Sequence, residues 1–182
     1  MIQGRRKDED VDLILKAVTF AALKHRDQRR KDAEASPYIN HPIALADLLW
    51  NEGGVRDTAV IAAALLHDTI EDTKTTAAEL RQAFGAKVAG IVAEVTDNKQ
   101  LSKERRKELQ VEHAAHISKS AKLVKLADKI CNVRDILESP PQDWPIERKR
   151  ECFDWAKKVI DQLRGTNSRL ERLFDRLYKK RS

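Results

Sequence analysis

The sequence is poor in the residues that disulfide scaffolds and β-sheets use. Its 182 residues include only two cysteines, Cys131 and Cys152, which are too few for a disulfide framework and do not form a metal-binding pair. Glycine and proline are sparse, at 6 and 5 residues, and no long segment alternates apolar and polar residues as half-buried strands do. These absences favour a helical protein whose thiols are reduced.

Long apolar runs are also absent. No run reaches the roughly 18 apolar residues that a membrane-spanning helix requires. Residues 1–10 are rich in charge and lack the apolar segment of a secretory signal. We therefore expect a cytoplasmic protein without a membrane partner, in which residues 1–10 are flexible.

The composition that remains is typical of helices. Hydrophobic residues make up 41% of the chain and charged residues 35%, and a chain of this length suits one domain of about 100–200 residues. We expect one all-α domain over residues 1–182, a helical bundle with a polar loop at residues 29–40. The expected helices cover residues 11–28, 42–52, 57–72, 76–85, 87–95, 104–116, 121–137, 145–164 and 166–181.

Cap residues define several of these boundaries. Asn40 or His41 can cap the helix that opens near Pro42, because proline is favoured in the first helical turn. Thr76 and Glu79 form a capping-box pattern at the start of a later helix. These local signals predict where helices begin more firmly than how they pack.

The chain is basic, with a formal net charge of +6 and a pI near 9.3. Such a charge suits either nucleic acid or a small polyanionic substrate. The basic residues fall in short, dispersed groups with no aromatic platform and no known nucleic-acid motif. The pattern therefore argues against a basic helical nucleic-acid binder, although charge alone does not decide the matter.

An acidic cluster follows the most apolar segment of the chain. His67 and Asp68 come directly after that segment, and Glu71 and Asp72 lie one helical turn later, so a continuous helix would carry an acidic face at its C-terminal end. Carboxylates there oppose the helix dipole by roughly 0.3–1 kcal/mol each and face desolvation. A bound cation would compensate for both.

Two further residues complete a candidate metal site. His41 lies at the start of an expected helix, and Asp128 lies at the edge of the buried stripe of another. Together with His67 and Asp68, they supply two imidazoles and two carboxylates, a set that suits a divalent first-row metal and leaves coordination positions open. Spacing alone leaves a second interpretation open, in which these histidines are hydrogen-bonded structural residues.

The order His41, His67-Asp68, Asp128 resembles that of the HD-domain metal-dependent phosphohydrolases. More of the chain resembles the hydrolase domain of the bacterial Rel/Spo alarmone enzymes, and most of all its free-standing form, the small alarmone hydrolases typified by the metazoan SpoT homologue. The resemblance runs from about residue 11 to residue 167. The matching segments are residues 28–31 (QRRK), 37–42 (PYINHP), 63–73 (AALLHDTIEDT), 84–85 (FG), 94–97 (EVTD) and 122–129 (KLVKLADK).

The resemblance implies a manganese-dependent pyrophosphohydrolase. It would remove the 3′-pyrophosphate from guanosine tetraphosphate or pentaphosphate and thereby clear the signal of the stringent response. On this resemblance Glu71 and Asp72 are the catalytic pair that activates water and returns a proton to the leaving oxygen. The implied Mn²⁺ ligands are His41, His67, Asp68 and Asp128.

The same matching suggests substrate contacts. Arg30 and Lys31, in the loop before the first metal histidine, would lie against the base and a phosphate, and Asn132 would contact the ribose. Lys103 and Arg148 are candidate phosphate ligands, although each lies in a charged segment that solvation also explains.

Other functions stay open on the sequence. The resemblance implies a tyrosine beside the nucleotide at the position of Cys152, so its absence leaves the preference for guanine open. An adenosine alarmone or the 2′-phosphate of NADPH is the alternative substrate. A nucleotide sensor with a catalytically inactive site is a second alternative. The presence of all the metal and catalytic positions argues against it. The oligomeric state is left open.

Overall fold

The computed structural model describes residues 2–141 and 143–181, and this part of the chain contains helices and no strand, as the composition predicts. Short loops connect the helices, and a lone antiparallel bridge joins Arg29 to Pro37. The helices are α1 (Ile2–Lys24), α2 (Asn40–Asp47), η1 (Leu48–Glu52, a π-helical turn), α3 (Thr58–Leu66), α4 (Thr69–Asp72), α5 (Ala77–Val95), α6 (Lys103–Ala114), α7 (Lys119–Glu138), α8 (Ile146–Asp161) and α9 (Ser168–Tyr178).

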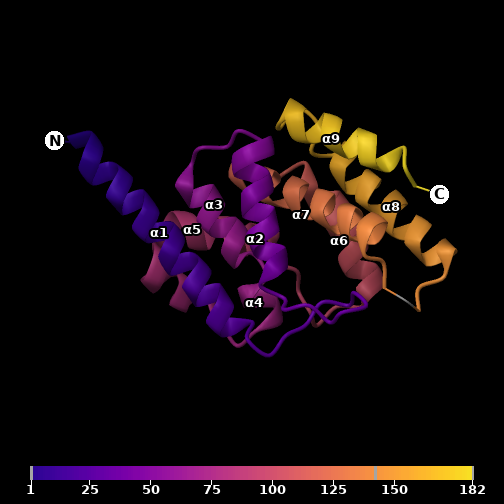
Figure 1. Ribbon diagram of the computed structural model, residues 1–182, viewed down its shortest axis with the longest axis horizontal. Coiled ribbons are helices and arrows are strands. Elements are labelled where there is room, and N and C mark those ends of the chain that lie inside the picture. The colour runs from indigo at the N-terminus through magenta and orange to yellow at the C-terminus, as the bar shows by residue number, and fades with distance from the viewer. Residues whose placement is uncertain (1, 142, 182) are drawn as a thin grey trace.

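Helix α3 forms the centre of the first half of the molecule. All of its residues from Ala59 to Leu66 are buried, and α1, α2, α5 and α7 pack against it (Figure 1). A short helix that is apolar on every side is stable only when other helices enclose it. Its C-terminal end, where the acidic cluster begins, is therefore held rigidly inside the bundle.

Helix α7 joins this half to the second one. It contacts α2, α3 and α5 on one side and α8 and α9 on the other, and α6 packs on α8 (Figure 1). Helix α7 therefore lies between the two halves of the molecule. Its residues, Asp128 among them, can contact the C-terminal end of α3 or the side formed by α6 and α8. No helix in the described part of the chain is both long enough and apolar enough to cross a bilayer.

Several caps are as predicted. The Asp57 carboxylate accepts a hydrogen bond from the Ala59 backbone at the start of α3, and the Thr76 hydroxyl accepts one from Glu79 at the start of α5. At α2 the prediction is wrong, since Ile39 occupies the cap position and makes no side-chain hydrogen bond there. The two helices expected around Gly85 run on as α5, interrupted by a kink at this residue.

The first helix begins earlier and ends earlier than predicted. It runs from Ile2 to Lys24 rather than over residues 11–28, so residues expected to precede it are helical. Charged residues fit an exposed helix as well as they fit a loop, which is why composition did not distinguish the two. After Lys24 the chain turns, and the buried His25 begins the segment that leads to the predicted loop.

Candidate active site

The helix that was expected to carry the whole acidic cluster is broken in the middle. Helix α3 ends at Leu66, and Asp68, at φ −99° and ψ 0°, leads into the single turn of α4. The Thr69 hydroxyl donates to the carbonyl of Leu66 at 2.7 Å and the Thr73 hydroxyl donates to that of Thr69 at 2.6 Å. The Thr69 hydroxyl thus caps a carbonyl at the end of α3. The prediction of one continuous acidic face is therefore wrong.

The break directs His67 into a cavity. Its Nδ1 lies 2.9 Å from the Ala64 carbonyl oxygen, and because a carbonyl oxygen only accepts, Nδ1 carries a hydrogen. This contact fixes the ring and leaves Nε2 to face the cavity, an arrangement common among metal-binding histidines.

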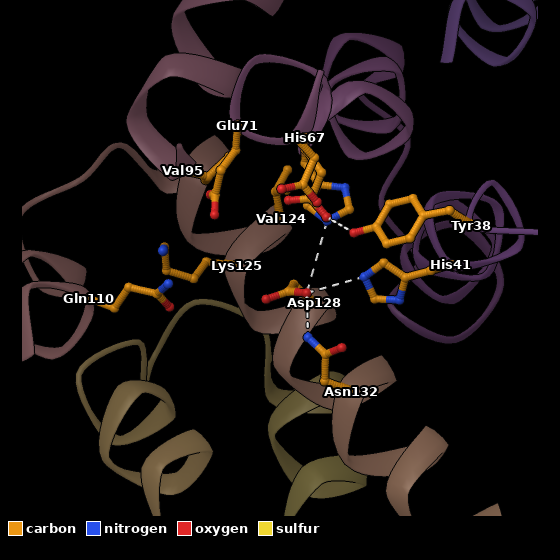
Figure 2. A pocket seen from close by; sticks show the side chains of 12 residues that line it. Tyr38, His41, His67, Glu71, Val95, Gln110, Val124, Lys125, Asp128 and Asn132 are labelled. Carbon is orange, nitrogen blue, oxygen red and sulfur yellow. Dashed lines mark hydrogen bonds and ion pairs between the residues drawn. The ribbon is translucent and has the colours of Figure 1, made fainter. Parts of the chain in front are cut away.

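His41, His67 and Asp128 meet at the floor of this cavity (Figure 2). One ligand atom from each of them lies within 4.8 Å of the other two. The Asp128 Oδ1 atom is 3.3 Å from His41 Nε2 and 3.9 Å from His67 Nε2. Residues from α2, α7 and the end of α3 are thus brought together although they are far apart in sequence.

Asp68, the fourth predicted ligand, lies beside this group. Its Oδ2 atom is 2.9 Å from His67 Nε2 and accepts a hydrogen bond from the Tyr38 hydroxyl. Tyr38 comes from the loop before α2, so the predicted substrate loop also supports the metal centre.

The donor set fits a divalent cation. His67 Nε2 is buried and makes no well-directed hydrogen bond, although Asp68 Oδ2 lies 2.9 Å away, and such a nitrogen is costly unless another group uses it. Ligands at about 2.1 Å from an octahedral ion lie roughly 3–4.2 Å from one another, close to the separations of Asp128 Oδ1 from the two imidazoles. Two imidazoles and acidic oxygens are the donors that first-row metals bind.

Electrostatic interactions link these side chains. Burial lowers the pKa of His67, but the carboxylate of Asp68 more than offsets this effect, so the pKa rises to about 9. Burial raises the pKa of Asp128, whereas the ammonium of Lys129 and the imidazole of His41 lower it well below its usual value. The Asp68 and Asp128 carboxylates are therefore ionised, a state that suits them to bind a cation.

Replacing Tyr38 with phenylalanine should weaken metal binding. The variant loses the hydroxyl that fixes the Asp68 carboxylate, and loss of such a supporting partner costs about 10–100-fold in affinity. Titration calorimetry with MnCl₂ measures the effect. Tyr178→Phe is the matched control, because its hydroxyl donates to the surface residue Asp154 at 2.8 Å. Equal affinities of the two variants would mean that Tyr38 does not support a ligand.

Glu71 lines the same cavity from α4. Its Oε2 atom accepts from the backbone N–H of Asp97 at 3.1 Å, and its Oε1 atom lies 3.5 Å from Arg106 Nη1. Burial raises the pKa of Glu71, and the Asp97 backbone hydrogen bond opposes that rise. A carboxyl group with a raised pKa can both accept and donate a proton near neutral pH.

Asp72 is held by a different set of partners. Its Oδ2 atom accepts from Gln28 Nε2 at 2.9 Å, and its Oδ1 atom pairs with the Lys99 ammonium. Gln28 is itself held by the buried His25, whose Nδ1 is 2.7 Å from Gln28 Oε1. The two predicted catalytic acids thus line one cavity in different surroundings.

A larger cavity of about 940 Å³ adjoins the small one, which measures about 210 Å³. The two share Tyr38, Glu71 and Asn132 among their lining residues. All five predicted substrate residues line the larger cavity, which we call the basic cleft. They are Arg30, Lys31, Lys103, Asn132 and Arg148.

Three of these residues already have partners in the protein. Arg30 pairs with the Asp135 carboxylate, and Asn132 Nδ2 donates to Asp128 Oδ1 at 2.6 Å. The guanidinium of Arg148 lies 4.1 Å from the centre of the Trp144 ring. The cleft is therefore partly organised before any ligand enters.

Sequence reasoning missed several residues of the site. Three of them line its cavities, namely Tyr38, Arg106 and Lys125. In the sequence, Tyr38 belongs to a loop, Arg106 to a charged helix and Lys125 to a buried helix, and none of them was predicted as a site residue. A lysine inside the apolar stretch of α7 was the available signal, because lysine is rarely buried without a role.

Known proteins resemble this chain in sequence and fold. Residues 17–155 match the HD domain family. The guanosine-3′,5′-bis(diphosphate) 3′-pyrophosphohydrolase MESH1 of Xenopus tropicalis is 56% identical over 169 residues, covering 93% of this chain and 94% of that protein. MESH1 of Homo sapiens is 54% identical over 168 residues, covering 92% of this chain and 94% of its own length.

A solved structure agrees with these relatives. It is described as a metazoan ortholog of SpoT that hydrolyses ppGpp and plays a role in starvation responses. It aligns with a TM-score of 0.90 at 46% identity, over 93% of this chain and 96% of that one.

Proposed function

We propose, because the chain belongs to the HD-domain family of guanosine-3′,5′-bis(diphosphate) 3′-pyrophosphohydrolases, that it hydrolyses guanosine tetraphosphate or pentaphosphate and releases pyrophosphate with GDP or GTP. The observation that carries this proposal is the adjacency of a His/Asp group, two half-buried acids and the basic cleft. In this view the protein clears a nucleotide stress signal, and we expect it to do so in the cytoplasm.

The HD-domain family is metal-dependent, and we propose Mn²⁺ as the metal. Four side chains would hold it, namely His41, His67, Asp68 and Asp128. A bound Mn²⁺ supplies Lewis-acid activation of water and of a phosphate oxygen. Tyr38 and Asn132 fix the two carboxylates through hydrogen bonds, so the ligands are oriented in advance.

The acids would move the protons of the reaction. A water oxygen attacks the phosphorus next to the 3′-oxygen, a new P–O bond forms, and the bond from phosphorus to the 3′-oxygen breaks. The half-buried Glu71, whose pKa is raised by partial burial, would take the water proton and return a proton to the 3′-oxygen. Asp72, held by Gln28 and Lys99, would orient the water.

The basic cleft would hold the rest of the nucleotide. Arg30 and Lys31 lie in the loop before α2, and Lys103 and Arg148 lie on α6 and α8, so cations line the cleft from separate elements. Ammonium and guanidinium groups bind phosphate well, and guanidinium also stacks on bases. Asn132 would contact the ribose from the cleft floor.

Adenosine alarmones and NADPH are the alternative substrates. Cys152 lines the cleft and is half-buried. The wall of the cleft therefore offers a thiol where the resemblance to the alarmone hydrolases implies an aromatic ring. The metal centre would serve any of these phosphate esters, and selection among bases depends on the cleft.

The direct test uses purified, metal-stripped protein and guanosine tetraphosphate. With Mn²⁺ added, we expect pyrophosphate and GDP in equal amounts, and without metal we expect neither. Release of inorganic phosphate from NADPH, or of pyrophosphate from adenosine alarmones only, would replace the proposed substrate. Inactivity on the whole panel would favour a nucleotide sensor.

A further inference from the structure

Lys125 is a buried cation without a partner. It lies in α7 one turn before Asp128, and only 7% of the residue is exposed. Within residues 2–141 and 143–181 it makes no hydrogen bond and no ion pair. Lysine is almost never fully buried unless it is paired, because removing its charge from water is costly. The position of Lys125 therefore calls for an explanation outside the packing of the bundle.

The neighbouring lysine shows what a paired one looks like. Lys129 is also buried, but its Nζ atom is 2.9 Å from Asp128 Oδ2 and 4.1 Å from the centre of the Trp155 ring. An ion pair and an aromatic face compensate for its burial. Lys125, one turn earlier on the same helix, has neither.

The side chain of Lys125 lines the small cavity that contains the metal ligands. It lies on the side of Glu71 and Gln110, across from His41 (Figure 2). A metal ion is excluded as its partner, because both carry positive charge. The ligand that such a place suits is an anion that also contacts the metal centre.

The acids around Lys125 are engaged elsewhere. Glu71 takes the hydrogen bond of the Asp97 backbone, and the Asp97 carboxylate accepts from Gln110 Nε2 at 2.5 Å. Burial lowers the pKa of Lys125 to about 8, and the charge of Lys129 lowers it too, while nearby carboxylates oppose the change. An ammonium therefore still predominates at neutral pH, and it lacks a counterion within ion-pair distance among the described residues.

We propose that the Lys125 ammonium binds a non-bridging oxygen of the phosphate group that is cleaved in the small cavity. The inference rests on the proposed function, and it adds a substrate-contacting residue that the sequence motifs did not suggest. In the small cavity the 3′-pyrophosphate would then face Lys125 and the side chains that would hold the metal, with the cations of the basic cleft beyond. An ammonium that is largely buried and held on a helix stabilises charge on a phosphoryl group with little reorganisation.

The test replaces Lys125 with methionine, which matches its length without the charge. Inorganic pyrophosphate serves as the probe, titrated by calorimetry into Mn²⁺-loaded protein. We expect about tenfold weaker binding or worse, since hydrogen bonds to charged groups are of that strength. Turnover of guanosine tetraphosphate should fall about 10²-fold, as when an oxyanion donor is removed, while Mn²⁺ content stays unchanged. Lys119→Met, at an exposed site on the same helix, should change neither.

The outcomes separate this inference from the proposed function. If Lys125→Met binds pyrophosphate and turns over substrate as the wild type does, the inference is wrong and the proposed function is unaffected. If the wild type does not hydrolyse guanosine tetraphosphate but binds pyrophosphate, and Lys125→Met abolishes that binding, the proposed function is wrong and the anion site at Lys125 is confirmed. Should Lys125→Met fail to fold, Lys125→Gln is subjected to the same two measurements and judged by the same results.

Discussion

Replacing Asp128 with alanine is expected to abolish both metal binding and turnover. Its carboxylate lies 3.3 Å from His41 Nε2 and 3.9 Å from His67 Nε2, so it is the anionic member of the group. Without it the two imidazoles face the buried ammonium of Lys129, which loses its counterion at the same time. We expect a loss of metal affinity beyond the roughly 100-fold that a supporting residue costs.

Metal content after dialysis, measured by atomic absorption, tests this expectation beside the turnover assay. His67→Ala should behave in the same way, because it removes the imidazole nitrogen that lies between the Asp68 and Asp128 carboxylates. Asp12→Ala is the control, since this carboxylate is 60% exposed on α1 and pairs with Lys16 at 2.7 Å, away from the candidate site. Full Mn²⁺ occupancy in Asp128→Ala would place the metal outside the proposed centre.

Local signals predicted most of the helices. Asp57 and Thr76 cap their helices as expected, and the apolar run before His67 is buried on all sides as its composition requires. The break after Leu66 was not predictable from periodicity, because it depends on the Thr69 hydroxyl, which caps a carbonyl at the end of α3, and on the packing of the cavity. The early start of α1 was missed because charge suits a solvated helix as well as a loop.

The residues of the site also fall into those that the sequence predicted and those that it did not. The motif residues were predicted because neighbouring imidazoles and carboxylates are visible in the sequence and resemble a known order. Their supports were not, since they act across the fold. Tyr38 and Asp68 are 30 residues apart in the sequence, and Arg106 and Glu71 are 35 residues apart. Such contacts depend on how helices pack, which hydrophobic periodicity does not specify.

The acid pair offers the sharpest separation of chemistry from metal binding. Changing Glu71 to glutamine together with Asp72 to asparagine should leave Mn²⁺ content unchanged, because neither residue belongs to the His41, His67 and Asp128 group. Turnover should fall by more than the about 10²–10⁴-fold attributed to one general acid–base group. An amide keeps the size of each side chain but cannot carry the proton between water and the 3′-oxygen.

The single variants then separate the two roles. Glu71→Gln should show the larger loss of turnover, since partial burial raises the pKa of that carboxyl group, which favours a role in proton transfer. Asp72→Asn should show a smaller loss, because an amide oxygen can still accept from Gln28 while the pair with Lys99 is lost. Glu108→Gln with Glu112→Gln is the matched control, as both acids pair with Arg105 on the exposed face of α6. Full activity in the double variant at Glu71 and Asp72 would reject the catalytic pair, and equal losses in the single variants would reject the division of labour between them.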